Sequence, residues 1–188
     1  MTLNLWKIEN VDVILLLVIV IYVIVCPYTK VEESFNMQAL HDLHHFSFFQ
    51  KLKAFDHLQF PGVVPRTFIG SLVLYGVGYP IYSIGSFLFH LYHTFLYGDD
   101  NFGIITYEGI YTQIFYRSLL GFFSWLSIVH FKQSLIHVFP KSYERIGELY
   151  SISLLLQFHI NFYASRTLPN IFAFILVMHA FALWFSVS

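Results

Sequence analysis

Charged residues are scarce in this sequence: Asp, Glu, Lys and Arg together make up 11% of it, while hydrophobic residues make up 57%. Soluble globular domains carry about 25% charged residues, so this chain has too few polar side chains to cover a water-exposed surface. The net charge of −1 and the lack of a polybasic cluster exclude a nucleic-acid-binding surface and an electrostatic membrane-surface binder. We therefore expect no nucleic-acid partner and a protein whose solvent is the lipid bilayer.

Cysteine is nearly absent as well. Cys26 is the only one, so no disulfide can form within the chain. Because it lies near the end of the apolar run at residues 11–28, we expect a small buried side chain there. That run lacks a small-residue cleavage site and strongly basic flanks, which argues against a signal peptide. We predict a retained transmembrane helix about 27 Å long.

Long apolar runs are what the sequence does contain. After residues 11–28, the runs that we predict to be membrane-embedded helices are residues 67–97, 111–131, 149–163 and 171–188. Residues 67–97 are long for one crossing and are interrupted at Gly78-Tyr79-Pro80, so we expect a kinked helix or a re-entrant pair. The predicted fold class is all-α: a polytopic bundle of transmembrane helices that forms a single module over residues 1–188.

One long polar stretch, residues 29–66, separates the first two apolar runs. Its apolar positions recur near helical spacing, with carboxylates and histidines between them, which predicts interfacial helices lying in the membrane plane. The loop that carries Lys132, Lys141 and Arg145 is basic, and the positive-inside rule assigns it to the cytosol. Residues 29–66 then face the opposite side of the membrane.

Two adjacent carboxylates, Glu32 and Glu33, follow the first predicted helix. A carboxylate beside low-dielectric lipid is a candidate general base. Acidic residues also suit the first turn of a helix, where they complement the positive end of the helix dipole. The residues alone leave both interpretations open.

Three arginines, Arg66, Arg117 and Arg166, lie at the ends of apolar segments. An arginine in such a position can extend its guanidinium to the lipid headgroups without any further role. Alternatively, guanidiniums that converge on one face can bind a phosphate or pyrophosphate through forked hydrogen bonds, without a metal. His57 is a further candidate for binding phosphate or sugar hydroxyls, although an ordinary interfacial histidine explains it equally well.

The segment His41-Asp42-Leu43-His44-His45 fits the HxxHH box of membrane di-iron desaturases and a degraded form of the zinc-protease HExxH motif. A protease needs Glu where Asp42 stands, and a desaturase needs further histidine boxes. Only His90 and His93 come near to a second box. A polar interfacial helix is the simpler interpretation, and a metal-dependent, desaturase-like enzyme built on these histidines stays as an alternative.

Three segments, taken in order, resemble a known family. They are Cys26-Pro27-Tyr28-Thr29-Lys30-Val31-Glu32-Glu33-Ser34-Phe35-Asn36, Phe60-Pro61-Gly62-Val63-Val64-Pro65-Arg66-Thr67-Phe68 and Arg166-Thr167-Leu168-Pro169-Asn170. They are similar to glycosyltransferase family 22, whose members have the GT-C fold and use dolichyl phosphate mannose as donor. Three blocks spread over most of the chain are more specific than any single short motif.

The resemblance implies a multi-pass mannosyltransferase of the endoplasmic reticulum membrane with its catalytic loop in the lumen. Such an enzyme transfers mannose from dolichyl phosphate mannose, in α-1,6 linkage and with inversion, to a dolichol-pyrophosphate-linked oligosaccharide during N-glycan precursor assembly. It needs no cofactor and no metal. Relatives are much longer, with more spans and a further luminal loop, so we expect this chain to be an N-terminal fragment that is inactive by itself.

The same resemblance implies roles for individual residues. Relatives usually carry Asp-Glu where this chain has Glu32-Glu33, and Glu32 is the preferred base, with Glu33 as the second catalytic candidate. Arg66 and Arg166 are implied to stabilise the leaving dolichyl phosphate, and Arg117 is a further candidate for the same role. A non-catalytic membrane subunit, whose polar loop docks a partner, is the remaining alternative.

Overall fold

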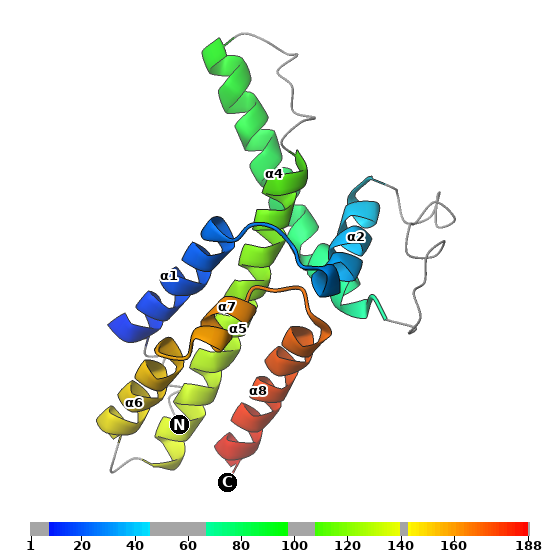
Figure 1. The fold of residues 1–188 in the computed structure, drawn as a ribbon. Helices are drawn as coiled ribbons and strands as arrows, with labels where there is room; N and C mark the ends of the chain where they lie inside the picture. The colour runs from blue at the N-terminus through cyan, green and yellow to red at the C-terminus, as the bar shows by residue number, and fades with distance from the viewer. Residues whose placement is uncertain (1–7, 46–66, 98–107, 140–142, 188) are drawn as a thin grey trace. The chain divides into compact units, whose positions relative to one another are not determined.

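The structure is a computed structural model that describes residues 8–45, 67–97, 108–139 and 143–187, and these ranges contain helices and no strand. The helices are α1 (Asn10–Val25), α2 (Val31–His45), α4 (Ile69–Tyr97), α5 (Glu108–Val138), α6 (Tyr143–Leu155), α7 (Phe158–Tyr163) and α8 (Pro169–Val187) (Figure 1). The predicted all-α class is confirmed.

Three stretches are long and apolar enough to cross a membrane: Ile69–Leu88 in α4, Gly109–Val138 in α5 and Pro169–Val187 in α8. Helix α1 is apolar but shorter, with 16 residues. At about 1.5 Å per residue it is about 24 Å long, slightly less than the hydrocarbon core of a thin bilayer. These helices bear out the prediction of a polytopic membrane protein.

Two expected segments have a different form in the structure. Residues 67–97 form one continuous helix from Ile69 to Tyr97 with Pro80 inside it. Residues 149–163 are instead divided between α6 and α7. At the break, the side-chain Nδ2 of Asn161 donates to the carbonyl of Leu155 at 2.7 Å and so satisfies one of the last carbonyls of α6.

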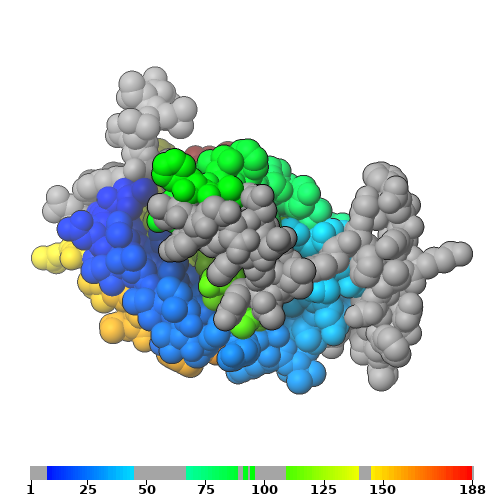
Figure 2. Space-filling model, turned by 90° about the horizontal axis from the view of Figure 1, so that it is seen from above, coloured from blue at the N-terminus to red at the C-terminus, as the bar shows by residue number. Residues whose placement is uncertain are grey.

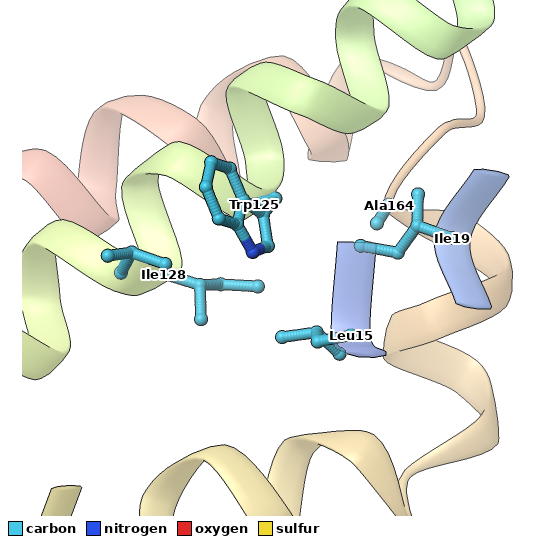
Figure 3. Close-up of a cluster of buried hydrophobic side chains, with 6 residues drawn as sticks. Leu15, Ile19, Trp125, Ile128 and Ala164 are labelled. Atoms are coloured by element: carbon cyan, nitrogen blue, oxygen red, sulfur yellow. The ribbon is translucent and has the colours of Figure 1, made fainter. Parts of the chain in front are cut away.

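The chain divides into two compact units, one of Met1–Cys26 with Arg117–Ser188 and the other of Pro27–Tyr116. In unit 1, the hydrophobic core is formed by side chains from α1, α5 and the segment after α7. Its members are Leu15, Ile19, Trp125, Ile128, Val129 and Ala164 (Figure 3). Lipid tails are as apolar as these side chains, so close packing, rather than escape from water, holds such a core together in a membrane.

Gly121 allows α5 to approach α1 closely within this core. A Cβ placed on Gly121 would lie 2.8 Å from Cγ2 of Ile19 and 3.2 Å from Cβ of Ser165. Ile19 is fully buried and β-branched, so its methyl group has little freedom to move away. The lack of a side chain at this position therefore sets the distance between the two helices.

A polar cluster joins the start of α1 to α5 and α6. Lys132 Nζ forms ion pairs with the Asp12 carboxylate and, at 3.3 Å, with Glu9 Oε2. Ser151 donates to the other Asp12 oxygen at 2.7 Å, and Trp125 Nε1 donates to the Asp12 carbonyl, also at 2.7 Å. Asp12, Lys132 and Ser151 are each at most 1% exposed. These buried charges are therefore paired rather than isolated.

Unit 2 consists of α2, α4 and the first residues of α5. Figure 1 shows α2 beside the start of α4, and in the space-filling view the atoms of α2 (light blue to cyan) reach the surface there (Figure 2). Ser71 of α4 donates to Asn36 of α2, and Thr112 of α5 donates to the Tyr82 hydroxyl of α4 at 3.1 Å. Side-chain hydrogen bonds thus connect these three helices.

Candidate functional site

The acidic pair lies in the first turn of α2, in unit 2. The helix begins where the Lys30 carbonyl accepts hydrogen bonds from the backbone N–H groups of Glu33 and Ser34, at 3.0 and 3.1 Å. Carboxylates in this turn complement the helix dipole. This local reason applies to both carboxylates.

The structure separates the two carboxylates by burial. Glu33 is fully buried, whereas Glu32 is exposed to solvent. Neighbouring residues in an α-helix point about 100° apart around the axis, so one can be covered while the other is open. An acceptor hydroxyl can reach an exposed carboxylate, which makes Glu32 the better placed of the two to act as a base.

The two described arginines of the sequence prediction, Arg117 and Arg166, converge in unit 1. Arg117 Nη1 donates to the Cys26 carbonyl at 2.8 Å, and Arg166 Nη2 donates to the same oxygen at 3.3 Å. Arg117 Nε also donates to the Ser165 carbonyl at 3.4 Å. The side chains are 0% and 2% exposed, so two full positive charges lie close together in a buried position.

Local structure explains how this arginine pair is held. Cys26 is the residue that ends α1, and a helix C-terminus presents carbonyls that a cation stabilises. The Arg166 guanidinium also lies 4.4 Å from the ring centre of Phe162, a distance typical of a cation–π contact. The backbone turns sharply here, with Arg166 N–H donating to the Tyr163 carbonyl at 2.8 Å. Both guanidiniums are therefore held in fixed positions.

Beside the arginine pair is a hydroxyl that the sequence gave no reason to single out. Ser165 is fully buried, and its Oγ has no hydrogen-bond partner within the residues that the structure describes. A buried hydroxyl without a partner is unfavourable unless a ligand or water completes it. Phosphate oxygens accept hydrogen bonds from groups of the kind found here, namely the side chains of Arg117, Arg166 and Ser165.

The remaining candidates are Arg66, His57 and the histidines of the possible metal motif. Arg66 and His57 lie outside the described residues, as do the side chains of His45, His90 and His93. His41 is exposed and lies 3.7 Å from the Asp42 carboxylate.

His44 is enclosed by tyrosine rings rather than by further ligand residues. Its ring centre lies 5.7, 5.6, 4.6 and 5.7 Å from those of Tyr75, Tyr79, Tyr82 and Tyr116. The described residues include no group of three or more His, Cys, Asp or Glu side chains that could hold a metal ion. Of the histidines in this motif, His44 of α2 therefore packs among aromatic rings from α4 and α5.

These features together define a class: a polytopic, all-α membrane protein of the GT-C type, with an acidic pair after its first helix and a buried pair of arginines. The chain belongs to the Alg9-like mannosyltransferase family, to which residues 13–188 match. The family supports the mannosyltransferase interpretation over a metal-dependent enzyme or a non-catalytic subunit.

Curated relatives from three organisms share one name, Dol-P-Man:Man(7)GlcNAc(2)-PP-Dol alpha-1,6-mannosyltransferase. The protein from Arabidopsis thaliana is 37% identical over 177 residues, covering 92% of this chain and 30% of the relative. The Saccharomyces cerevisiae protein is 33% identical, covering 85% and 29%, and the Drosophila melanogaster protein is 32% identical, covering 92% and 22%. The chain thus spans less than a third of the length of these relatives. No solved structure matches it.

Proposed function

We propose that this chain takes part in mannosyl transfer from dolichyl phosphate mannose, in α-1,6 linkage, to a dolichol-pyrophosphate-linked oligosaccharide. The observation that carries the proposal is the match to relatives that are named for this reaction, at 31–37% identity over most of the chain. Membership of the mannosyltransferase family and three membrane-length apolar helices support it. We place the reaction at the endoplasmic reticulum membrane, with α2 on the luminal side.

Glu32 is the proposed general base. It takes the proton from the 6-hydroxyl of an acceptor mannose while that oxygen attacks C1 of the donor mannose. The bond between C1 and the phosphate oxygen breaks, and the electron pair leaves with dolichyl phosphate. Exposure of Glu32 on α2 supports this assignment over Glu33, which is buried.

The leaving phosphate gains negative charge as the bond to C1 breaks. Arg117 and Arg166 are the proposed groups that stabilise this charge. Because they are buried, they act electrostatically, through guanidiniums that hydrogen bonds to the Cys26 carbonyl already hold in place. Charges that need no reorganisation and lie in a low-dielectric site stabilise a transition state more than mobile, hydrated ones. A metal ion is not required for this role, and we propose none.

Replacing Glu32 with Gln in the encoding gene tests the proposal. Loss of the base is expected to lower the transfer rate by about 10²–10⁴-fold, so the acceptor oligosaccharide should accumulate on dolichol pyrophosphate. The measurement is extraction and sizing of lipid-linked oligosaccharides from cells that carry the variant.

The matched control is His41→Ala, which removes an exposed histidine from the same helix. A mannosyltransferase should tolerate it, whereas an enzyme that relies on the histidine motif should lose activity. Normal oligosaccharides in the Glu32→Gln cells would show that Glu32 is not the base. A non-catalytic subunit would produce that same result.

A further inference from the structure

The acidic pair lies between two points at which side chains of other helices hold the backbone of its segment. Before the pair, Gln113 of α5 donates through Nε2 to the Pro27 carbonyl at 2.9 Å. After it, Ser71 of α4 lies 3.1 Å from both the backbone carbonyl and the side-chain Oδ1 of Asn36. All of these residues belong to unit 2.

The contact between Ser71 and Asn36 is buried and directional. Ser71 is 0% exposed and Asn36 is 3% exposed. The Ser71 hydroxyl has one proton, so it donates to one acceptor at a time. With the amide of Asn36 turned over, it can instead donate to the carbonyl and accept from the amide NH₂. If α2 turned away, the buried Ser71 hydroxyl would lose these acceptors, and a buried hydroxyl without an acceptor is unfavourable.

Because of the position of Asn36 on α2, this contact also determines which of the two carboxylates is covered. Glu32 is four residues before Asn36 and Glu33 is three residues before it. At about 100° per residue, the two carboxylates lie about 40° and about 60° from Asn36, on opposite sides of it. A rotation of α2 about its axis by a few tens of degrees would therefore exchange which carboxylate is covered.

We propose that Ser71 is a positioning residue that fixes the rotation of α2, so that Glu32 is presented for catalysis and Glu33 is kept covered, while Gln113 holds the segment that leads into the helix. The assignment of a catalytic role to Glu32 rests on the proposed function, but the rotation itself does not. His44 and its four tyrosine rings hold the far end of α2, so loss of Ser71 affects mainly the first two turns.

Thiol labelling measures the rotation without any assay of activity. Cys26 is the only cysteine in this sequence. Cys26→Ala, together with replacement of any cysteine elsewhere in the expressed protein, provides a background for single cysteines. Glu32→Cys and Glu33→Cys are made in this background, and their modification rates by a membrane-impermeant maleimide are compared in permeabilised membranes. With Ser71 present, we expect Glu32→Cys to react much faster than Glu33→Cys.

Adding Ser71→Ala is expected to bring the two labelling rates toward equality. Gln113→Met, which removes a bond to the segment before the helix, should change their ratio less. Ser71→Thr keeps the hydroxyl and should restore the difference between the rates. Ser86→Ala, which removes an exposed hydroxyl elsewhere on α4, should change nothing. If Ser71→Ala leaves the ratio of the rates unchanged in protein of normal abundance, the inference is overturned.

The catalytic consequence is measured with Glu32 and Glu33 intact. A displacement of a catalytic group by about 1 Å lowers the rate about 100-fold, so Ser71→Ala should lower kcat strongly and leave KM for the donor nearly unchanged. An unchanged kcat together with a collapsed labelling ratio would overturn the positioning role. Full transfer by Glu32→Gln would instead overturn the proposed base, and the labelling result would stand.

Discussion

Arg117 combines a structural role and a proposed chemical role in one side chain. Its guanidinium donates to the Cys26 carbonyl at the end of α1, and the same charge is proposed to face a departing phosphate. A cation at a helix C-terminus contributes about 0.3–1 kcal/mol of stability, and up to ~2 kcal/mol when partly buried. A test of its chemistry must therefore separate the amount of folded protein from the rate of transfer.

Arg166 offers the cleaner test of phosphate stabilisation, because its bond to Cys26 is the longer of the two. We expect Arg166→Gln to lower the transfer rate by about 10²–10³-fold, as when one preorganised donor is lost. Arg166→Lys should recover part of this rate, since lysine keeps the positive charge but lacks the paired N–H donors of the guanidinium. The measurement is transfer per folded molecule in membranes, and wild-type transfer by Arg166→Gln would contradict the role.

Arg145→Gln is the control, since it removes an exposed arginine from α6 in the same unit. It should leave transfer unchanged. A similar loss in both variants would point to an effect of net charge on the membrane or on expression, rather than to a phosphate site.

The sequence predicted which residues to consider here, but not their arrangement. The position of Arg117 and Arg166 at the ends of apolar runs was visible in the residue pattern. Their common acceptor was not, because the Cys26 carbonyl is backbone and has no residue-type signal. The difference between Glu32 and Glu33 was equally hidden, since two identical side chains differ only through the rotation of α2.

Among the helices, α1 depends most on polar contacts at its start. The Asp12 carboxylate accepts a hydrogen bond from the backbone N–H of Glu9, the N-cap residue of α1, at 2.9 Å. It also binds Lys132 of α5 and Ser151 of α6. A buried ion pair of this kind is a weak source of net stability, yet removal of one partner leaves an unpaired buried charge. The cluster therefore specifies which face of α1 meets α5 and α6.

We predict that Lys132→Met destabilises the protein by about 3–5 kcal/mol, because the Asp12 carboxylate keeps its burial and loses its cation. The double variant Lys132→Met with Asp12→Asn should recover part of this loss, since the uncompensated charge is gone. Thermal unfolding of purified protein in detergent measures both. Equal melting temperatures for the single and the double variant would contradict the prediction.

At this scale, hydropathy was sufficient to predict that the helices exist, because long apolar runs are strong signals. It did not predict the break between α6 and α7, since residues 149–163 are apolar throughout most of their length. At the break Asn161 contacts Leu155, and a polar residue within an apolar run does not reveal its partner. At Pro80 the error was the reverse: the sequence predicted an interruption, but the helix continues through this residue.

For the molecule as a whole, the orientation in the membrane is the property on which the proposed function depends most. The donor and acceptor of the proposed reaction are both membrane-anchored lipids, so the side of the membrane on which α2 lies decides whether they can reach Glu32. The sequence signal for the cytosolic side was a loop with Lys132, Lys141 and Arg145. The structure corrects this for Lys132, which lies within α5 and is buried in ion pairs with Glu9 and Asp12.

Single cysteines in the Cys26→Ala background test this orientation. In sealed microsomes, we expect a membrane-impermeant maleimide to modify Arg145→Cys without permeabilisation, and Glu32→Cys only after permeabilisation. The control is the Cys26→Ala protein itself, which should not react under either condition. The reverse pattern would place α2 in the cytosol and would remove the luminal assignment.

The close approach at Gly121 has a genetic consequence. Every missense change in this codon adds at least a β-carbon, and the nearest methyl group is only 2.8 Å from where that carbon would lie. Polarity and charge therefore matter less at this codon than volume does. In a saturation mutagenesis experiment scored by glycosylation of a reporter protein, position 121 should reject apolar and polar residues alike, unlike its neighbour Phe122, whose side chain is 41% exposed.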